Sequence, residues 1–293
     1  MAGGFALGGE GLTLPAPAKI NRFLHVLGRD AAGYHQLQTV FQFCEWGDTL
    51  ELKPRADAQI HLRGDLSGVA AEENLAHRAA VALRAAAGPA AAGLGADIHL
   101  HKLIPPGSGL GGGSSDAATA LLVLNRLWGC ALSIDELARI ALTLGADVPV
   151  FVRGHAAWAE GVGERLTPSR PPEGWSLLAI PDQSVSTAAV FGHPDLPRDS
   201  AAMTPQNACN GRTRNDCEAL VRQLCPAVDR ALHWLSRYGS PRMSGTGSAV
   251  FLNLESRAEA TRIRAQAPPD LAIHVVRRCN RSPLHLALEH DPG

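Results

Sequence analysis

The segment Pro105-Pro106-Gly107-Ser108-Gly109-Leu110-Gly111-Gly112-Gly113-Ser114-Ser115-Asp116 leads from an apolar stretch directly into an amphipathic one. Glycine has no Cβ, so a glycine-rich backbone can come close to a ligand and direct its amide groups toward it. The N-terminus of a helix also attracts anions. A flexible linker is the alternative, but linkers rarely lead straight into a well-formed helix. The segment therefore predicts a phosphate-binding loop at the start of a helix.

Two other nucleotide-binding motifs fit this loop less well. Gly107, Gly109 and Gly112 match the G-x-G-x-x-G pattern of a nicotinamide oxidoreductase. That motif also needs an acidic residue at the end of a second strand about 20 residues on, and here this distance leads to Asp135, inside a predicted helix cap. A Walker A loop needs a lysine after the glycines, and none follows. Both alternatives are disfavoured.

Outward from the loop, strand and helix patterns interleave without a strict β-α-β alternation, which predicts an α+β fold. The predicted strands are 21–27, 37–43, 49–52, 59–62, 97–103, 175–180, 249–254 and 271–276, and the predicted helices are 72–87, 114–128, 133–144, 215–238 and 257–267. The helix over 133–144 begins with a capping box, Ser133 to Glu136, and stops at Gly145. Residues 1–12 are expected to form a flexible extension. A proline-rich stretch near residue 168 predicts a boundary between domains 13–168 and 169–293.

Composition restricts the classes of partner. The 27 Lys and Arg residues nearly balance the 28 Asp and Glu residues, so no overall positive field exists to hold a nucleic acid or an anionic membrane. No apolar run approaches the roughly 20 residues of a membrane helix, and the first residues lack the charges of a signal or transit peptide. We expect a cytoplasmic protein with small-molecule partners.

Cysteine and lysine usage adds two expectations. The six cysteines form no C-x-x-C pair, which argues against a zinc site or a disulfide framework and favours reduced thiols. Lysine occurs only at Lys19, Lys53 and Lys102, while arginine supplies the remaining positive charge. Each lysine is therefore favoured as a position that needs a compact ammonium group.

Three segments in order along the chain resemble the motifs of the GHMP kinase superfamily, which contains galactokinases, homoserine kinases, mevalonate kinases and phosphomevalonate kinases. Residues 15–21 are similar to its first motif, the glycine loop to its second and residues 244–248 to its third. The segments 33–35, 144–151 and 151–154 resemble the branch that acts on a cytidyl diphosphate substrate. The resemblance runs from about residue 15 to about residue 285.

The resemblance implies a two-domain GHMP kinase fold, with an N-terminal domain similar to ribosomal protein S5 domain 2 and a ferredoxin-like C-terminal domain. It implies phosphoryl transfer from ATP, with Mg²⁺, to the 2-hydroxyl of a diphosphocytidyl-linked methylerythritol in isoprenoid precursor synthesis. A related kinase for homoserine or a mevalonate-like alcohol is the alternative, disfavoured by Gly33-Tyr34-His35. A non-catalytic RNA-binding module is disfavoured by the near-neutral charge.

Lys19 and Asp147 both lie among apolar neighbours, where a charge is costly to bury without a partner. From the residues alone, a turn aspartate before Pro149 and a lysine that extends to solvent remain equally good interpretations. The resemblance implies that Asp147 accepts from or orients the substrate hydroxyl. It also implies that Lys19 fixes that carboxylate and stabilises the reacting oxygen or phosphate.

The resemblance also implies two sets of binding residues. For ATP these are Asn74, Leu75, Pro105, Pro106, Gly107, Ser108, Gly109, Leu110, Gly111, Gly112, Gly113, Ser114 and Ser115. For the substrate they are Asn21, Tyr34, His35, Thr187, Phe191, Gly245, Thr246 and Gly247. An aromatic ring beside a hydrogen-bonding residue suits a nucleobase, so Tyr34 and Phe191 are expected to enclose cytosine, although Phe191 alone fits an ordinary core position.

Some residues near the loop have two interpretations. Ser114 and Ser115 can cap the helix or contact phosphate or Mg²⁺, and the sequence does not separate these roles. Asp116 fits a structural role, because a carboxylate in the first turn is favoured by the helix dipole. No metal ligand is assigned, and no role is given to four histidines in the strand patterns: His25, His61, His99 and His101.

Overall fold

A computed structural model describes residues 11–65, 68–210 and 213–290. The extension predicted over residues 1–12 lies outside the described residues as far as residue 10, and the first strand begins at Leu12. The strands are β1 Leu12–Arg29, β2 His35–Arg55, β3 Ile60–Gly64, β4 Gly95–His101, β5 Ala157–Gly161, β6 Arg165–Pro168, β7 Gly174–Ile180, β8 Arg242–Met243, β9 Val250–Leu254 and β10 Ala272–Cys279. The α-helices are α1 Leu75–Ala86, α2 Gly112–Leu127, α3 Ile134–Leu144, α4 Val148–Arg153, α5 Thr187–Gly192, α6 Pro205–Asn210, α7 Glu218–Leu224, α8 Pro226–Ser236, α9 Arg257–Arg264 and α10 Pro283–His290.

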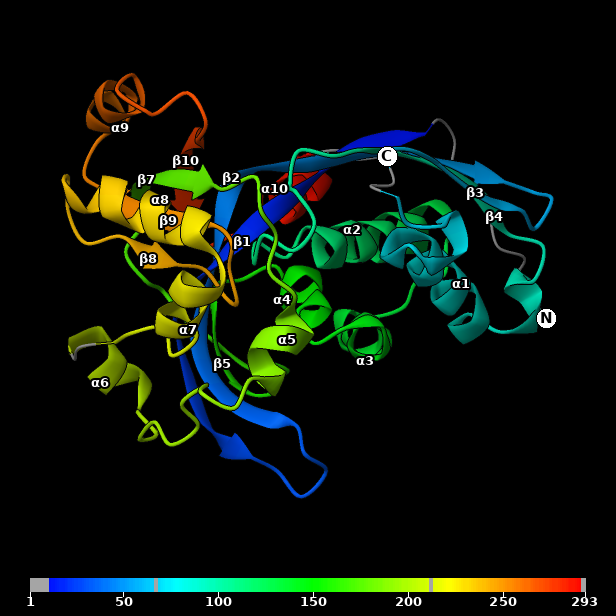
Figure 1. The fold of residues 1–293 in the computed structure, drawn as a ribbon. Coiled ribbons are helices and arrows are strands. Elements are labelled where there is room, and N and C mark those ends of the chain that lie inside the picture. Colours follow the sequence, from blue (N-terminus) through cyan, green and yellow to red (C-terminus); the bar gives the residue numbers. More distant parts are fainter. Residues whose placement is uncertain (1–10, 66–67, 211–212, 291–293) are drawn as a thin grey trace.

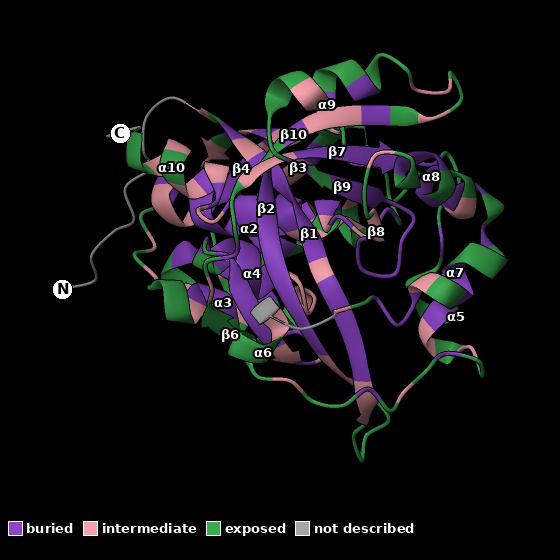
Figure 2. Ribbon diagram, turned by 90° about the vertical axis from the view of Figure 1, so that its left-hand side faces the viewer, coloured by how far each residue is buried: buried purple, intermediate pink, exposed green. Residues whose placement is uncertain are grey.

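One sheet joins these strands, in the order β3-β4-β2-β10-β7-β9-β8, with β1 and β5 also paired to β2 and β6 paired to β5. The long antiparallel pair β1 and β2 crosses the molecule and ends in an exposed turn, residues 30–34 (Figure 1). Figure 2 shows a long buried stretch in each of these two strands. The mixture of strands and helices confirms the predicted α+β class.

The two largest apolar cores among the described residues lie against this sheet. In the first, α2 packs on β1 and β2, and α1, α3 and α4 pack around α2. Trp128 is fully buried, and its indole nitrogen donates to the Gly95 carbonyl at 3.0 Å. The second is formed by β7 and β9 with α7, α8 and α9. The division at residues 168 and 169 stays a prediction, because β10 pairs with both β2 and β7 and so joins strands from the two sides in one sheet.

The capping box predicted for the helix over 133–144 is confirmed. The Ser133 hydroxyl accepts from the Glu136 amide at 3.3 Å, and the Glu136 carboxylate accepts from the Ser133 amide at 2.8 Å. Both donors would otherwise lack a partner at the helix start. The helix ends at Leu144, followed by Gly145 as predicted.

Three predictions of element boundaries were wrong. The strands expected over 37–43 and 49–52 are one strand, β2, because shifts in the β1–β2 register accommodate the bend without ending the pairing. The single helix expected over 215–238 is two helices, since Pro226 disfavours a helical backbone at Cys225, which has φ −134° and ψ 90°. The helix after the glycine loop begins at Gly112 with Gly111 as its N-cap, so neither Ser114 nor Ser115 caps it.

The sequence patterns also missed several short elements: β5, β6, β8, α4, α5, α6 and α10. Most have six residues or fewer, too short for a periodic pattern to stand out. Within the described ranges, none of the helices is both long and apolar enough to cross a bilayer.

Candidate active site

A cavity of about 610 Å³ lies where the first strand, the glycine loop and α4 meet, a size typical of small-molecule sites. The predicted residues that line it are Lys19, Asn21, Asn74, Leu75, Pro105, Pro106, Gly107, Ser108, Gly109, Gly111, Gly112, Gly113, Ser114, Asp147, Thr187, Phe191, Gly245 and Thr246. The predicted residues outside its lining are Tyr34, His35, Leu110, Ser115 and Gly247. The structure therefore brings together most of the two predicted binding sets.

Lys19 and Asp147 form an ion pair in this cavity, with 3.0 Å between Lys19 Nζ and Asp147 Oδ2. The ammonium also donates to Asn21 Oδ1 at 2.6 Å and to the Gly109 carbonyl at 3.3 Å, and it lies 5.0 Å from the centre of the Phe41 ring. These partners compensate for the burial of a lysine whose side chain is only 4% exposed. A lysine that extends to solvent is thereby excluded.

Local backbone geometry presents these two charges to the cavity. Lys19 follows a register shift in β1, and its amide donates to the Leu110 carbonyl at 2.9 Å, which fixes the strand against the loop. Asp147 precedes α4, which has Pro149 in its first turn, and the Asp147 side chain makes no capping hydrogen bond. With its side chain 33% exposed, that carboxylate stays open to a ligand.

The glycine loop is held in a conformation that a side chain would prevent at two positions. Gly109 has φ +74°, and a Cβ there would stand 2.3 Å from the Ser244 carbonyl oxygen. Gly111 has φ +75°, and a Cβ there would stand 3.1 Å from Lys19 Cε. The third motif fixes the loop in return, because the Ser244 hydroxyl donates to the Gly109 carbonyl at 3.0 Å and the Ala249 amide to the Ser108 carbonyl at 2.9 Å.

No side chain caps α2, so the amide groups of its first turn face the loop without an intrahelical partner. This arrangement favours a bound anion. The serines expected to cap the helix do not, and Ser114 lines the cavity while the Ser115 hydroxyl is buried with no hydrogen-bond partner in the described chain.

A buried ion network lies beside the loop and was not predicted. Lys102 binds both Asp48 and Asp116, and the Asp116 contact is 2.8 Å long. Burial raises the pKa of Asp116 to about 7, with Lys102 opposing that change and Asp48 adding to it. Burial alone would lower the pKa of Lys102, but the two carboxylates outweigh it and raise that pKa. The only sequence signal that Lys102 has a special role was the scarcity of lysine, and this signal did not indicate which residues Lys102 contacts.

This network predicts a pH dependence of stability. The folded-state pKa of Asp116 lies above its ordinary value of 3.8, so the folded protein keeps this proton to higher pH than the unfolded chain, and stability falls as pH rises from 3.8 to about 7. Asp116→Asn removes this titrating group, so its free energy of unfolding should fall less than that of the wild type as pH rises from about 5 to about 8. Urea unfolding of both proteins at the two pH values measures this difference. An equal difference at both pH values would contradict the assignment.

Two of the residues predicted to bind the substrate contact each other, and a third is exposed. The Phe191 ring lies against His35, with 4.8 Å between ring centres, while Tyr34 is 66% exposed. His35 Nε2 accepts from Arg198 at 3.1 Å and from Arg29 at 3.2 Å. Burial, followed by these two arginines, lowers the pKa of His35, so its ring is neutral at pH 7. The enclosure of cytosine by Tyr34 and Phe191 stays a prediction.

Sequence reasoning missed Asn215, which orders the third motif. Its side-chain amide donates to the carbonyls of Met243 at 2.9 Å and Gly245 at 2.7 Å. Thr246 in that motif shares a hydrogen bond of 2.9 Å with Thr187. A lone asparagine at the edge of a predicted helix carries no signal for such a long-range role.

Comparison with known proteins agrees with this geometry. The sequence model "GHMP kinases N terminal domain" matches residues 74–155, and "GHMP kinases C terminal" matches residues 199–270. A 4-diphosphocytidyl-2-C-methyl-D-erythritol kinase from Chromohalobacter salexigens is 51% identical over 96% of this chain and 95% of its own length. The enzyme of the same name from Halorhodospira halophila is 53% identical over 94% of this chain and 95% of its own length. A crystal structure of 4-(cytidine 5'-diphospho)-2C-methyl-D-erythritol kinase superposes with a TM-score of 0.76 at 34% identity, covering 91% of this chain and 99% of the other.

Fold and cavity thus define a kinase of the GHMP superfamily, which confirms the predicted two-domain GHMP kinase class. Homoserine kinase and mevalonate kinase structures share this fold at 16% and 14% identity. Within the superfamily, the chain belongs to the 4-diphosphocytidyl-2-C-methyl-D-erythritol kinase family.

Proposed function

We propose that this protein transfers the γ-phosphoryl group of ATP to the 2-hydroxyl of 4-diphosphocytidyl-2-C-methyl-D-erythritol. The observation that carries the proposal is the ion pair of Lys19 with Asp147, which stands in one cavity with the glycine loop. A hydroxyl group bound at Asp147 would face a phosphate bound at the loop amides. Two relatives, 51% and 53% identical to this chain over the aligned residues, have names that contain this substrate.

Each part of the cavity has a role that suits phosphoryl transfer. The transition state is loose and anionic, so positioning and charge neutralisation matter more than covalent help. Asp147 would orient the substrate hydroxyl and accept its proton. Lys19 would hold that carboxylate in place and stabilise the charge on the transferred group. The amides at the start of α2 would bind the phosphates of ATP.

The residues present also fit Mg²⁺, which prefers carboxylate oxygens together with substrate phosphates. Asp116 lines the cavity, and its Oδ1 atom is buried with no hydrogen-bond partner among the residues that the structure describes. We propose that Asp116 helps to hold the ion, and that the Ser114 hydroxyl beside it in the cavity is the next candidate. When bound, Mg²⁺ would neutralise charge on the β- and γ-phosphates.

We propose that Phe191 and the exposed Tyr34 form the cytidyl end of the site, with His35 as the residue that reads the base edge and Thr187 near the methylerythritol. With 4.8 Å between their centres, the rings of His35 and Phe191 leave no room for a third ring between them. Cytosine would therefore stack on one side of this pair, and the exposed Tyr34 is free to close over it. Discrimination between cytosine and uracil would depend on hydrogen bonds, because both bases stack equally well.

The substrate proposal is tested with steady-state kinetics. Stacking on an aromatic ring is worth about 1 to 3 kcal/mol per base, so Tyr34→Ala should raise KM for the cytidyl substrate about five- to 150-fold and leave KM for ATP unchanged. Tyr34→Phe is the matched control and should be nearly silent, because it keeps the ring. Equal kcat/KM for the cytidine and uridine substrates would contradict base recognition. A preference for homoserine or mevalonate would contradict the proposed substrate.

We also propose a cytoplasmic location. The five cysteines whose side chains are described are free thiols: Cys44, Cys130, Cys217, Cys225 and Cys279. Free thiols suit a reducing compartment, where disulfides are rare.

A further inference from the structure

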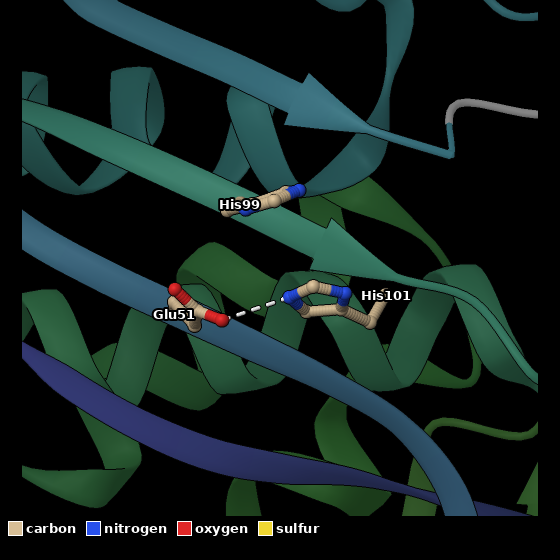
Figure 3. Close-up of side chains that lie close together, drawn as sticks. All are labelled: Glu51, His99 and His101. Atoms are coloured by element: carbon tan, nitrogen blue, oxygen red, sulfur yellow. Dashed lines mark hydrogen bonds and ion pairs between the residues drawn. The ribbon is translucent and has the colours of Figure 1, made fainter.

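Three side chains that can bind a metal meet on the face of the sheet that points away from the helices (Figure 3). Glu51 lies on β2 directly opposite His99 on β4, and His101 follows two residues later on β4. Because alternate residues of a strand share a face, all three point to the same side. The residues between and around them point into the first core: Leu50, Leu52, Ile98 and Leu100.

The three groups are close enough to share one ion. His101 Nε2 lies 2.9 Å from Glu51 Oε1, the imidazole ring centres are 4.3 Å apart, and one ligand atom from each residue lies within 4.8 Å of the others. Zinc at bonds of about 2.0 to 2.1 Å holds its ligand atoms about 3.4 Å apart in a tetrahedron. The side chains of His101 and Glu51 are 48% and 43% exposed, so rotation about their side-chain bonds can close the remaining gap without moving a strand.

We propose that Glu51, His99 and His101 form a transition-metal site that takes Zn²⁺, separate from the kinase cavity. Two imidazole nitrogens and one carboxylate oxygen are a common protein ligand set for zinc, with the fourth position open to water. Mg²⁺ prefers oxygen ligands, so the ion proposed for phosphoryl transfer would not compete well here. None of the three residues lines the kinase cavity.

The local charges favour a site of modest affinity. Lys53 follows Glu51 by two residues on the same face, and Arg63 pairs with His99 across β3 and β4. Both cations oppose a bound metal ion. The ion would tie β2 to β4 immediately before Lys102.

Calorimetric titration of the full chain with zinc sulfate, at neutral pH and with Mg²⁺ present, tests the proposal. One saturable site is expected, and it should be absent in the double variant His99→Ala/His101→Ala. Glu51→Gln should bind zinc at least about tenfold more weakly, because losing an outer-shell partner alone costs about 10- to 100-fold. Co²⁺ added instead should give visible absorption bands that the double variant lacks.

His61→Ala is the matched control, because His61 lies on β3 outside the three-residue group and pairs instead with Asp97, 3.1 Å away. This variant should bind zinc as the wild type does. The double variant should keep the melting temperature and the Mg²⁺-supported kinase rate of the wild type. No saturable zinc binding by the wild type, or equal binding by the double variant, would overturn the proposal.

Discussion

Asp147→Asn should lower kcat by about two to four orders of magnitude, the range expected when a group that accepts a proton in the transition state is lost. Asparagine has nearly the same shape but cannot take the proton or balance the ammonium of Lys19. The fold should survive, because Lys19 keeps its hydrogen bonds to Asn21 and Gly109. Binding of ATP should stay close to normal, since the loop amides do not depend on this carboxylate.

The measurement is steady-state kcat with both substrates saturating, together with the Kd of ATP. Asp135→Asn is the matched control: it also removes a carboxylate paired with a cation, Arg153 at 3.0 Å, but at an exposed position outside the cavity lining. That variant should keep wild-type kcat. An Asp147→Asn enzyme with near wild-type kcat would remove Asp147 from the mechanism.

The sequence supported the parts of this site that rest on local rules. A glycine-rich segment before a helix predicted the loop, and the capping box over Ser133 to Glu136 predicted its neighbour helix. Each of these signals is formed by residues only a few positions apart in the sequence. The pairing of Lys19 with Asp147 was different, because residues so far apart have no periodic relation. The residues alone left that pair open, and the family resemblance supplied it.

Other parts of the site had no readable signal. The network of Lys102, Asp48 and Asp116 depends on a strand that continues through a bend, and the patterns had divided that strand in two. Asp116 was interpreted as a partner of the helix dipole because its position in the first turn was the only information available. The contact of His35 with Phe191 depends on how the exposed turn approaches α5, which tertiary packing decides.

Lys19→Arg tests the other half of the ion pair and should lower kcat about 10²- to 10³-fold, as expected when one preorganised donor is misplaced. The ammonium is held at 3.0 Å from Asp147 and 2.6 Å from Asn21, in a space that suits one compact donor. A planar guanidinium has a different shape and donor geometry. The loop leaves little room beside Lys19, because a Cβ added at Gly111 would stand only 3.1 Å from Lys19 Cε.

Lys53→Arg is the matched control, since Lys53 is exposed on β2 and outside the cavity lining, and it should keep wild-type kcat. Thermal unfolding of both variants separates a misfolded enzyme from an inactive one. Lys19→Met, which keeps the length of the side chain and removes the charge, should be at least as inactive as Lys19→Arg, because the transferred phosphoryl group would then lack its cation. Wild-type kcat in Lys19→Arg would show that the site needs only a positive charge. Wild-type kcat in Lys19→Met would show that the buried ammonium serves the fold and not the reaction.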